Sequence, residues 1–319
     1  MHQHWGWLIV IYLFLGGLGA GAYLTSYAAG KGWLGNSPAL QRAGYFVAAP
    51  VVAFGTLLLV FDLGQGLKKP WLLIGLLMNP RSVMTWGVYI LATFILVGLI
   101  VAFFALKKKQ ASKVLVNLGA ILALATGAYT GLLVAVVKAI PFWNTYLMPV
   151  LFVVSALSTG LSITTLVAHF LEKGQKTDEQ KVTKMHLGLV AVELVILAGF
   201  VGMMLSGSSG VVGIESAKML TSGSLKIPFW GILIGLGLVV PLGVFGYGLT
   251  KLAPAKGKRA LQPELVPAVS EMEGAAALEG SHGVTSALLV SDALVVIGGF
   301  VLRYVVIFAA LPIWNGGFN

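Results

Sequence analysis

The sequence predicts an all-α, polytopic membrane protein with eight transmembrane helices, and three observations lead to that prediction. Apolar residues make up 58% of the 319 residues and charged residues only 10%, which suits helices packed in lipid. The apolar residues gather in eight long stretches separated by short loops. The Lys and Arg residues fall mostly in alternate loops, as expected when successive loops lie on opposite sides of a membrane.

Each apolar stretch is about 19 to 28 residues long, enough for a helix to cross a hydrocarbon core of about 30 Å. A helix pairs its backbone N–H and C=O groups within one segment, which lipid requires. In chain order the expected spans are residues 7–29, 45–63, 83–106, 114–137, 147–170, 187–205, 229–249 and 284–311. They form a single integral membrane domain over residues 1–319, because no stretch between them is large enough for a soluble domain.

The first stretch, residues 7–29, is expected to remain as a span and not to be cleaved as a signal peptide. No Lys or Arg precedes it, it is longer than a signal-peptide core, and seven further spans follow. The longest loop, residues 251–283, is rich in Ala, Pro and Glu and has little apolar periodicity. It is expected to be a surface loop without activity of its own.

Positive charge predicts the orientation of the chain. The loops after spans one, three, five and seven hold fourteen Lys and Arg residues, whereas the other loops hold six. The positive-inside rule places the first set, including residues 251–283, in the cytoplasm and both termini outside the inner (cytoplasmic) membrane. The net charge of +10 is therefore a topology signal, and nucleic-acid binding is not expected because no folded domain carries a basic face.

Glycine spacing within the spans predicts close helix packing. Glycines recur at four-residue intervals in the pairs Gly17 and Gly21, Gly127 and Gly131, and Gly231 and Gly235. Such pairs let two helix backbones approach each other closely. The glycine-rich run at residues 16–21 loosely matches a dinucleotide-binding turn, but it follows no strand, so that interpretation is rejected.

Tryptophans are unevenly distributed between the two sides. Seven of the eight, all except Trp33, fall near the expected outer ends of the spans. An aromatic belt at the membrane interface explains most of them. The asymmetry also favours an outer surface on which partner proteins dock, because aromatic residues are enriched where proteins meet.

Ionisable and phenolic side chains within the spans are the candidates for function, because such groups are costly in lipid. Tyr12 on span one, Asp62 at the end of span two and Tyr129 on span four all lie in the outer half. Phenols and a carboxylate around an apolar slot suit a quinone headgroup, which needs hydrogen bonds to two carbonyl oxygens and a group for proton exchange. For Asp62 and Arg303, a structural ion pair or snorkelling to the interface is the alternative.

Two carboxylates lie in the inner half of the membrane. Glu193 on span six and Asp292 on span eight are placed to pass protons from the cytoplasm, and a hydrogen-bonded packing pair is the alternative. Haem ligation needs two histidines on facing spans at similar depth, and only His169 and His186 come close, so haem is not expected. The chain has no cysteine, so any iron–sulfur cluster must belong to a partner.

Several motifs together resemble the NrfD/PsrC family, the membrane subunits of polysulfide-reductase-type respiratory enzymes. The resemblance runs over essentially the whole chain. It is carried by residues 12–21 in span one, Asp62-Leu63-Gly64, Asn79-Pro80-Arg81-Ser82, Thr85-Trp86-Gly87, Tyr129-Thr130-Gly131, Pro141-Phe142-Trp143-Asn144, Pro149, Gly299-Phe300 and Leu302-Arg303-Tyr304.

The resemblance implies two four-helix bundles without haem, and electron exchange between menaquinone or ubiquinone and a ferredoxin-like iron–sulfur subunit. That subunit contacts a catalytic subunit, often a molybdopterin enzyme, and both are expected on the outer face. The quinone pocket of the family lies in the first bundle, and its span-four tyrosine matches Tyr129. A span-one histidine of some members aligns near Tyr12, so this sequence departs from the pattern, and His4 is a candidate replacement.

The resulting prediction is a membrane anchor and quinone-binding subunit, embedded in lipid and without a catalytic centre of its own. The expected quinone-binding residues are Tyr129, Tyr12, Asp62, His4, Trp7 and Thr130, with Glu193 and Asp292 for proton transfer and Arg303 and Arg81 as structural or pocket charges. Two alternatives come from other classes of protein. A secondary transporter needs paired broken helices, and no convincing repeat surrounds Pro50 and Pro241. A structural anchor would have no quinone site.

Overall fold

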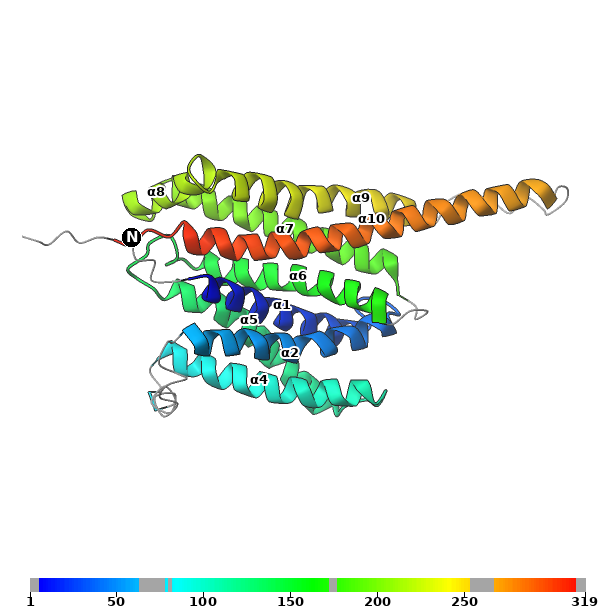
Figure 1. Cartoon of the computed structure of the whole chain (residues 1–319), viewed down its shortest axis with the longest axis horizontal. Coiled ribbons are helices and arrows are strands. Elements are labelled where there is room, and N and C mark those ends of the chain that lie inside the picture. Colours follow the sequence, from blue (N-terminus) through cyan, green and yellow to red (C-terminus); the bar gives the residue numbers. More distant parts are fainter. Residues whose placement is uncertain (1–5, 63–77, 80–81, 172–176, 253–266, 314–319) are drawn as a thin grey trace, which may run out of the picture.

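The computed structural model describes residues 6–62, 78–79, 82–171, 177–252 and 267–313, without the side chains of Asp62 and of residues 267–284. Within these ranges the chain is all-α, and eight helices are long and apolar enough to cross a membrane. The predicted fold class is confirmed by this helix content. Figure 1 shows the helices side by side along one axis, with α1 beginning and α10 ending at the same end of the bundle. Following the predicted orientation, we call that end the outer end and the opposite end the inner end.

The eight spans are single helices, except that the seventh changes from π-type to α-helical turns partway along. They are α1 (Trp7–Gly30), α2 (Pro38–Asp62), α4 (Val83–Leu106), α5 (Lys113–Ala135), α6 (Leu147–Leu171), α7 (Glu179–Leu205), η1 (Ile227–Val239) with α9 (Val240–Leu252), and α10 (Pro267–Phe308). A shorter helix, α8 (Gly210–Thr221), connects the sixth span to the seventh and packs on α7 and η1.

Three helices begin earlier than the sequence predicts. α2 starts at residue 38 instead of 45, and α7 starts at residue 179 instead of 187. The first two turns of both helices carry charged residues such as Arg42 and Lys181, so hydropathy alone places the start of each span too late. α10 starts at Pro267, within the segment expected to be a loop. Ala and Glu in that segment favour helix, and proline is well tolerated in the first turn.

The helix contacts place α1 and α6 at the centre of the bundle. α1 packs against α2, α5, α6 and α10, while α6 packs against α1, α2, α5, α7 and α10 (Figure 1). In the first four spans, α2 packs between α1 and α4, and α5 packs against α4 and α1. In the last four spans, α6 packs against α7, and α10 packs against α6, η1 and α9. The division into two four-helix bundles stays a prediction, because α6 contacts three helices of the first set.

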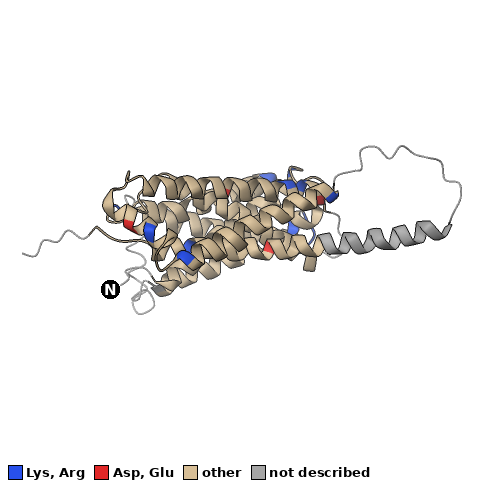
Figure 2. Cartoon of the chain, turned by 90° about the horizontal axis from the view of Figure 1, so that it is seen from above, with Lys and Arg blue, Asp and Glu red and all other residues tan. Residues whose placement is uncertain are grey.

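Lys, Arg, Asp and Glu residues lie mainly towards the two ends of the bundle, with few between them (Figure 2). The long middle sections of the helices are tan in that view, which is the distribution expected for helices that cross lipid. This distribution makes the few charges at mid-depth conspicuous candidates for function.

The tightest helix crossing joins α1 to α6 through glycines. A Cβ atom added at Gly21 would lie 1.8 Å from the Ala156 carbonyl oxygen, and one added at Gly160 would lie 2.1 Å from the Gly21 carbonyl carbon. The backbones are therefore in direct contact, which confirms the packing prediction for Gly21. The prediction is wrong for Gly231, where an added Cβ would meet no described atom within 4 Å.

The two aromatic side chains of the outer turn at residues 141–144 are buried and are not part of an exposed aromatic surface. Phe142 and Trp143 are 0% and 1% exposed, and the Trp143 indole Nε1 donates a hydrogen bond to the Val306 carbonyl oxygen at 2.8 Å. Trp143 thus links this turn to α10 instead of facing lipid or a partner. Among the described tryptophans near the outer end, Trp7, Trp86 and Trp230 are half-exposed.

Candidate functional site

Two phenols from α1 and α5 meet near the outer end of the bundle. Tyr12 lies five residues after the start of α1, and Tyr129 lies six residues before the end of α5. At 1.5 Å per residue both lie about 8 to 9 Å inside their helices. Their side chains are 0% and 4% exposed, and the two hydroxyl groups interact electrostatically.

A glycine of α4 makes room for the Tyr129 ring. A Cβ atom added at Gly87 would lie 1.9 Å from Tyr129 Cζ and 2.0 Å from its hydroxyl oxygen. Any side chain at position 87 would therefore displace the phenol. The position of the Tyr129 ring therefore depends on two helices. Its backbone belongs to α5, and the ring occupies the space that a side chain at Gly87 of α4 would fill.

The Tyr12 hydroxyl is buried and has no hydrogen-bond partner among the described residues. Tyr12 belongs to the large hydrophobic core cluster, which also contains Tyr129, Leu91 and Leu133. A buried hydroxyl without a partner loses about 1 to 3 kcal/mol of solvation that nothing replaces. A ligand with a carbonyl oxygen would supply the missing acceptor, so this part of the chain fits a quinone headgroup.

The other expected quinone-binding residues fall into three situations. Thr130 is buried on the same helix as Tyr129, but its hydroxyl donates to the Gly127 carbonyl oxygen at 2.7 Å, which leaves only its acceptor capacity free. Trp7 stacks on Tyr304 of α10 with ring centroids 5.1 Å apart, so its ring packs against α10. The Asp62 side chain, His4 and Arg81 lie outside the described residues.

Arg303 is fully buried at mid-bundle, where α10 meets α6. Its Nη1 atom donates to the Ser155 hydroxyl and, at 2.9 Å, to the Gly299 carbonyl oxygen, while Nη2 donates to the Phe152 carbonyl oxygen at 3.3 Å. The guanidinium also interacts electrostatically with Glu193 of α7. Arg303 is therefore a charge that joins α6, α7 and α10.

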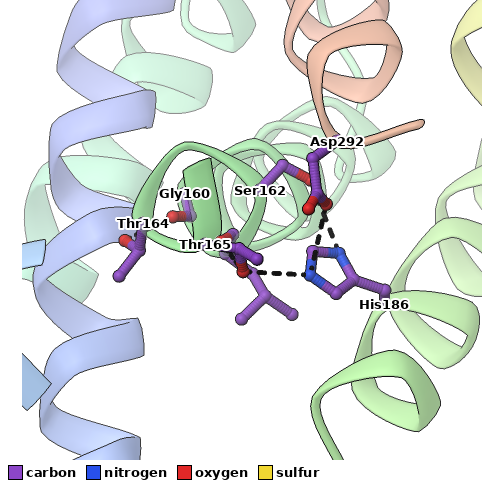
Figure 3. A network of polar contacts seen from close by, with 7 residues as sticks. Gly160, Ser162, Thr164, Thr165, His186 and Asp292 are labelled. Atoms are coloured by element: carbon purple, nitrogen blue, oxygen red, sulfur yellow. Dashed lines mark hydrogen bonds and ion pairs between the residues drawn. The ribbon is translucent and has the colours of Figure 1, made fainter. Parts of the chain in front are cut away.

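A second polar cluster lies closer to the inner end. His186 Nε2 of α7 is 3.3 Å from Asp292 Oδ1 of α10, and both side chains are nearly fully buried. Hydroxyls of α6 lie on either side of the imidazole, with Ser162 Oγ 3.4 Å from Nδ1 and Thr165 Oγ1 3.4 Å from Nε2 (Figure 3). The imidazole also stacks on Phe245 of α9 at 4.7 Å.

A line of hydroxyls on α6 connects the two polar clusters. Ser155, Ser158, Ser162 and Thr165 follow one another at intervals of three or four residues, so they share one face of the helix. The Glu193 carboxyl lies against the first two, and the Asp292 carboxyl lies against Ser162. From Ser155 to Thr165 this line covers about 15 Å of the membrane thickness.

Glu193 and Asp292 each have a partner that the sequence did not indicate. The packing pair considered for these two carboxylates is replaced by two separate pairs, Glu193 with Arg303 and Asp292 with His186. The described partners of Arg303 come from α6, α7 and α10. The ion pair considered for Asp62 and Arg303 stays a prediction, because the Asp62 side chain lies outside the described residues.

A cavity of about 370 Å³ reaches the second cluster from the inner end. Its lining includes His186 and Asp292 at the buried side, and His169, Thr177 and Glu179 where α6 ends and α7 begins. The cavity therefore connects the buried pair with the end of the bundle predicted to face the cytoplasm.

Sequence comparison assigns the chain to a family. Residues 1–254 match the family described as polysulphide reductase, NrfD. The chain belongs to the NrfD family. The matched region holds Tyr12, Tyr129 and Glu193, whereas Asp292 and Arg303 follow it.

Similarity to individual NrfD-family proteins extends over most of both sequences. The C subunit of polysulfide reductase from Wolinella succinogenes is 33% identical over 264 residues, which cover 75% of this chain and 81% of that protein. Protein NrfD of Escherichia coli is 30% identical over 269 residues, covering 75% and 83%. The NrfD homolog of Haemophilus influenzae is 27% identical over 276 residues, covering 75% and 82%. With its eight apolar helices, this NrfD-family chain is an integral multi-pass membrane protein.

Sequence reasoning did not identify the polar line of this NrfD-family protein. His186 was considered only as a haem ligand, and the hydroxyls of α6 were not considered at all. A usable signal was present, because Ser and Thr recur at intervals of three and four residues along residues 155–165 of an otherwise apolar span. In lipid such a row either bonds to its own backbone or faces other polar groups.

Proposed function

We propose that this NrfD-family protein is the quinone-binding membrane subunit of a respiratory oxidoreductase, which exchanges electrons between the quinone pool and an iron–sulfur partner. The observation that carries the proposal is the buried Tyr12 hydroxyl, which lacks a partner among the described residues and lies beside Tyr129. A pair of phenols in an apolar surrounding offers two hydrogen-bond donors and no fixed charge, which suits a neutral ligand with two carbonyl oxygens.

In this proposal each phenol has a defined task. Tyr129 donates a hydrogen bond to one carbonyl oxygen, in a position fixed by Gly87. Tyr12 donates from the α1 side, and Asp62, the last residue of α2, exchanges protons with the outer surface. A bound menaquinone or ubiquinone supplies two-electron, two-proton redox chemistry. The apolar residues around the phenols exclude water, so that protons enter and leave only through these groups.

The partners follow from what the sequence lacks. It has no cysteine, so electrons must pass to a centre on another subunit. One relative is named as the C subunit of polysulfide reductase, a name that implies further subunits. We place a ferredoxin-like iron–sulfur subunit and a catalytic, molybdopterin-type subunit at the outer end, nearest the two phenols. The protein lies in the inner membrane with both termini outside.

Proton transfer from the inner end is the second part of the proposal. The cavity at His186 and Asp292 opens a route from the inner end, and the hydroxyls of α6 continue it towards Glu193 and Arg303. A row of neighbouring hydroxyl and carboxyl groups can transfer protons through a part of the membrane from which water is excluded. The route ends at Arg303. Its guanidinium lies against Gly17 of α1, because a Cβ atom added at Gly17 would lie 3.0 Å from Arg303 Nη2.

Purification of the tagged protein from its native membrane in mild detergent tests the main proposal. Iron, quinone and co-purifying proteins are measured in the same sample. The proposal predicts an iron–sulfur protein together with about one quinone per NrfD-family subunit. A protein that is free of iron, quinone and partners in several detergents would contradict it and would make solute transport the next assay.

A further inference from the structure

A further cavity lies at the inner end of the first four spans, away from both polar clusters. It encloses about 630 Å³ between the end of α1, the start of α2, the end of α4 and the start of α5. None of the residues proposed above for quinone binding or proton transfer lines it. Its chemistry therefore calls for a separate explanation.

Cations surround this cavity and no acidic residue is among the described residues that line it. The basic residues of its lining are Lys31, Arg42, Lys108, Lys109 and Lys113. Gln41, Gln110 and Asn117 add neutral polar groups. The first 171 residues contain ten Lys and Arg residues but only one acidic residue, Asp62. Asp62 is at the end of α2 opposite to the cavity. The four lysines around this hollow, Lys31, Lys108, Lys109 and Lys113, repel each other unless an anion is bound.

Asp178, an acidic residue of the described chain beside the α1–α2 connection, is already engaged. Asp178 contacts Gly35 in the α1–α2 connection. Its carboxylate accepts a hydrogen bond from the Lys181 backbone N–H at 3.1 Å and pairs with Lys181 Nζ at 3.9 Å. Asp178 therefore caps α7 and does not neutralise the cavity.

Aromatic side chains lie on one side of the cavity, and exposed apolar residues lie nearby at the same end of α4 and α5. Tyr45 lines it, and the Tyr23 ring packs beneath at a centroid distance of 4.9 Å, with its hydroxyl donating to the Val116 carbonyl oxygen at 3.2 Å. Apolar Val101 and Ala105 form part of the wall. The same end of α4 and the start of α5 carry highly exposed apolar residues, Leu106 at 67% and Val114 at 76%.

The backbone at the rim holds one of the lysines in an unusual conformation. Lys108 has a φ of 54°, in the left-handed region that at helix ends usually belongs to glycine. A lysine is strained in this conformation, because its Cβ atom lies too close to the following carbonyl oxygen. The turn that ends α4 thereby keeps Lys108 and Lys109 at the mouth of the cavity.

We propose that this cavity binds the phosphate headgroup of an anionic phospholipid, whose acyl chains lie against α4 and α5. Basic hollows between transmembrane helices on the cytoplasmic side suit acidic lipid headgroups. A soluble phosphate compound would satisfy the same cations, but it would gain nothing from the apolar surface next to the rim. The position at the ends of four spans places the cations at the depth of lipid phosphates.

Native mass spectrometry of the full-length protein in mild detergent tests the proposal, with dioleoyl phosphatidylglycerol and dioleoyl phosphatidylcholine as probes. The expected result is at least tenfold tighter binding of phosphatidylglycerol, and about a tenfold loss of that preference in Lys109→Gln/Lys113→Gln. Lys108 is left unchanged because its backbone ends α4. The matched control is Lys184→Gln/Lys251→Gln, two exposed lysines of the same end outside the cavity, which should keep the preference.

Three outcomes would overturn the proposal. The first is equal binding of the two lipids by the unaltered protein. The second is an equal loss of preference in the cavity variant and in the control variant, which would indicate only a general surface charge. The third is displacement of phosphatidylglycerol by millimolar glycerol phosphate, which would assign the cavity to a soluble anion. Size-exclusion profiles of all variants show whether each is folded.

Discussion

His186 of α7 and Asp292 of α10 lie 3.3 Å apart in the inner half of the bundle, and their side chains are 3% and 2% exposed. Two ionisable groups at this depth are costly unless each compensates the other. Their contact with the cavity at the inner end makes the pair the natural entry point of a proton route.

The first prediction concerns this proton route. The double variant Glu193→Gln/Asp292→Asn should lower proton uptake from the inner side at least tenfold, because both ionisable steps of the α6 line are removed. Uptake is measured with a pH-sensitive dye in proteoliposomes that contain the whole complex. The control is Glu215→Gln, which neutralises a carboxylate on α8 outside the route and should leave uptake unchanged. Normal turnover with normal uptake in the double variant would remove the route.

The second prediction concerns the buried charge at mid-bundle. Arg303→Met should destabilise the protein by about 3 kcal/mol or more, because Glu193 loses its cation and Ser155 loses its donor. Adding Glu193→Gln should recover about 1 kcal/mol of that loss, since the uncompensated carboxylate disappears. Unfolding in detergent measures both variants, with Lys218→Ala on the exposed face of α8 as the control. Equal stability of the single and double variants would show that Glu193 and Arg303 are not coupled.

The third prediction concerns the α1–α6 crossing. Gly160→Ala should destabilise the protein by about 1 to 3 kcal/mol, because its Cβ would overlap the backbone of Gly21. Gly199→Ala on α7 is the matched control, since a Cβ there meets no described atom within 4 Å. That change should be neutral or stabilise by up to about 1 kcal/mol, as expected for alanine in a helix. Similar effects at the two positions would contradict the close approach.

The fourth prediction tests the quinone site without removing a polar group. Gly87→Ala should weaken quinone binding at least tenfold, because the added methyl group displaces the Tyr129 ring that lies 1.9 Å from its position. Gly98→Ala on the same helix is the control, since its Cβ would crowd Ala49 at 2.9 Å. It should cost stability but leave the affinity of the folded protein intact. Unchanged affinity in Gly87→Ala would remove Tyr129 from the site.

The spans could be predicted from the sequence because lipid imposes a simple rule on composition and length. The starts of α2 and α7 could not, since the first two turns of these helices carry charged residues and continue beyond the apolar core. The start of α10 was missed for a different reason, because residues 267–283 favour helix through Ala and Glu and show little apolar periodicity.

The sequence predicts how deep in the membrane each site residue lies, but not towards which neighbouring helix its side chain points. Counting residues from the helix ends places Tyr12 and Tyr129 at similar depths, and the structure brings them together. The same counting placed Glu193 beside Asp292, yet rotation of α7 and α10 about their axes gives each a different partner. Rotation depends on which neighbouring faces pack together, and that information lies in contacts between distant segments of the sequence.

Quinone affinity of the purified full-length protein tests the central claim most directly. The variant Tyr12→Phe/Tyr129→Phe removes both phenol hydroxyls and keeps both rings. The control is Tyr23→Phe, which is equally buried on α1 but lies about 16 Å further along the helix. Binding of a menaquinone analogue is measured by quenching of tryptophan fluorescence. The account predicts at least a tenfold loss of affinity in the double variant and none in the control. Equal affinity in all three proteins would contradict it.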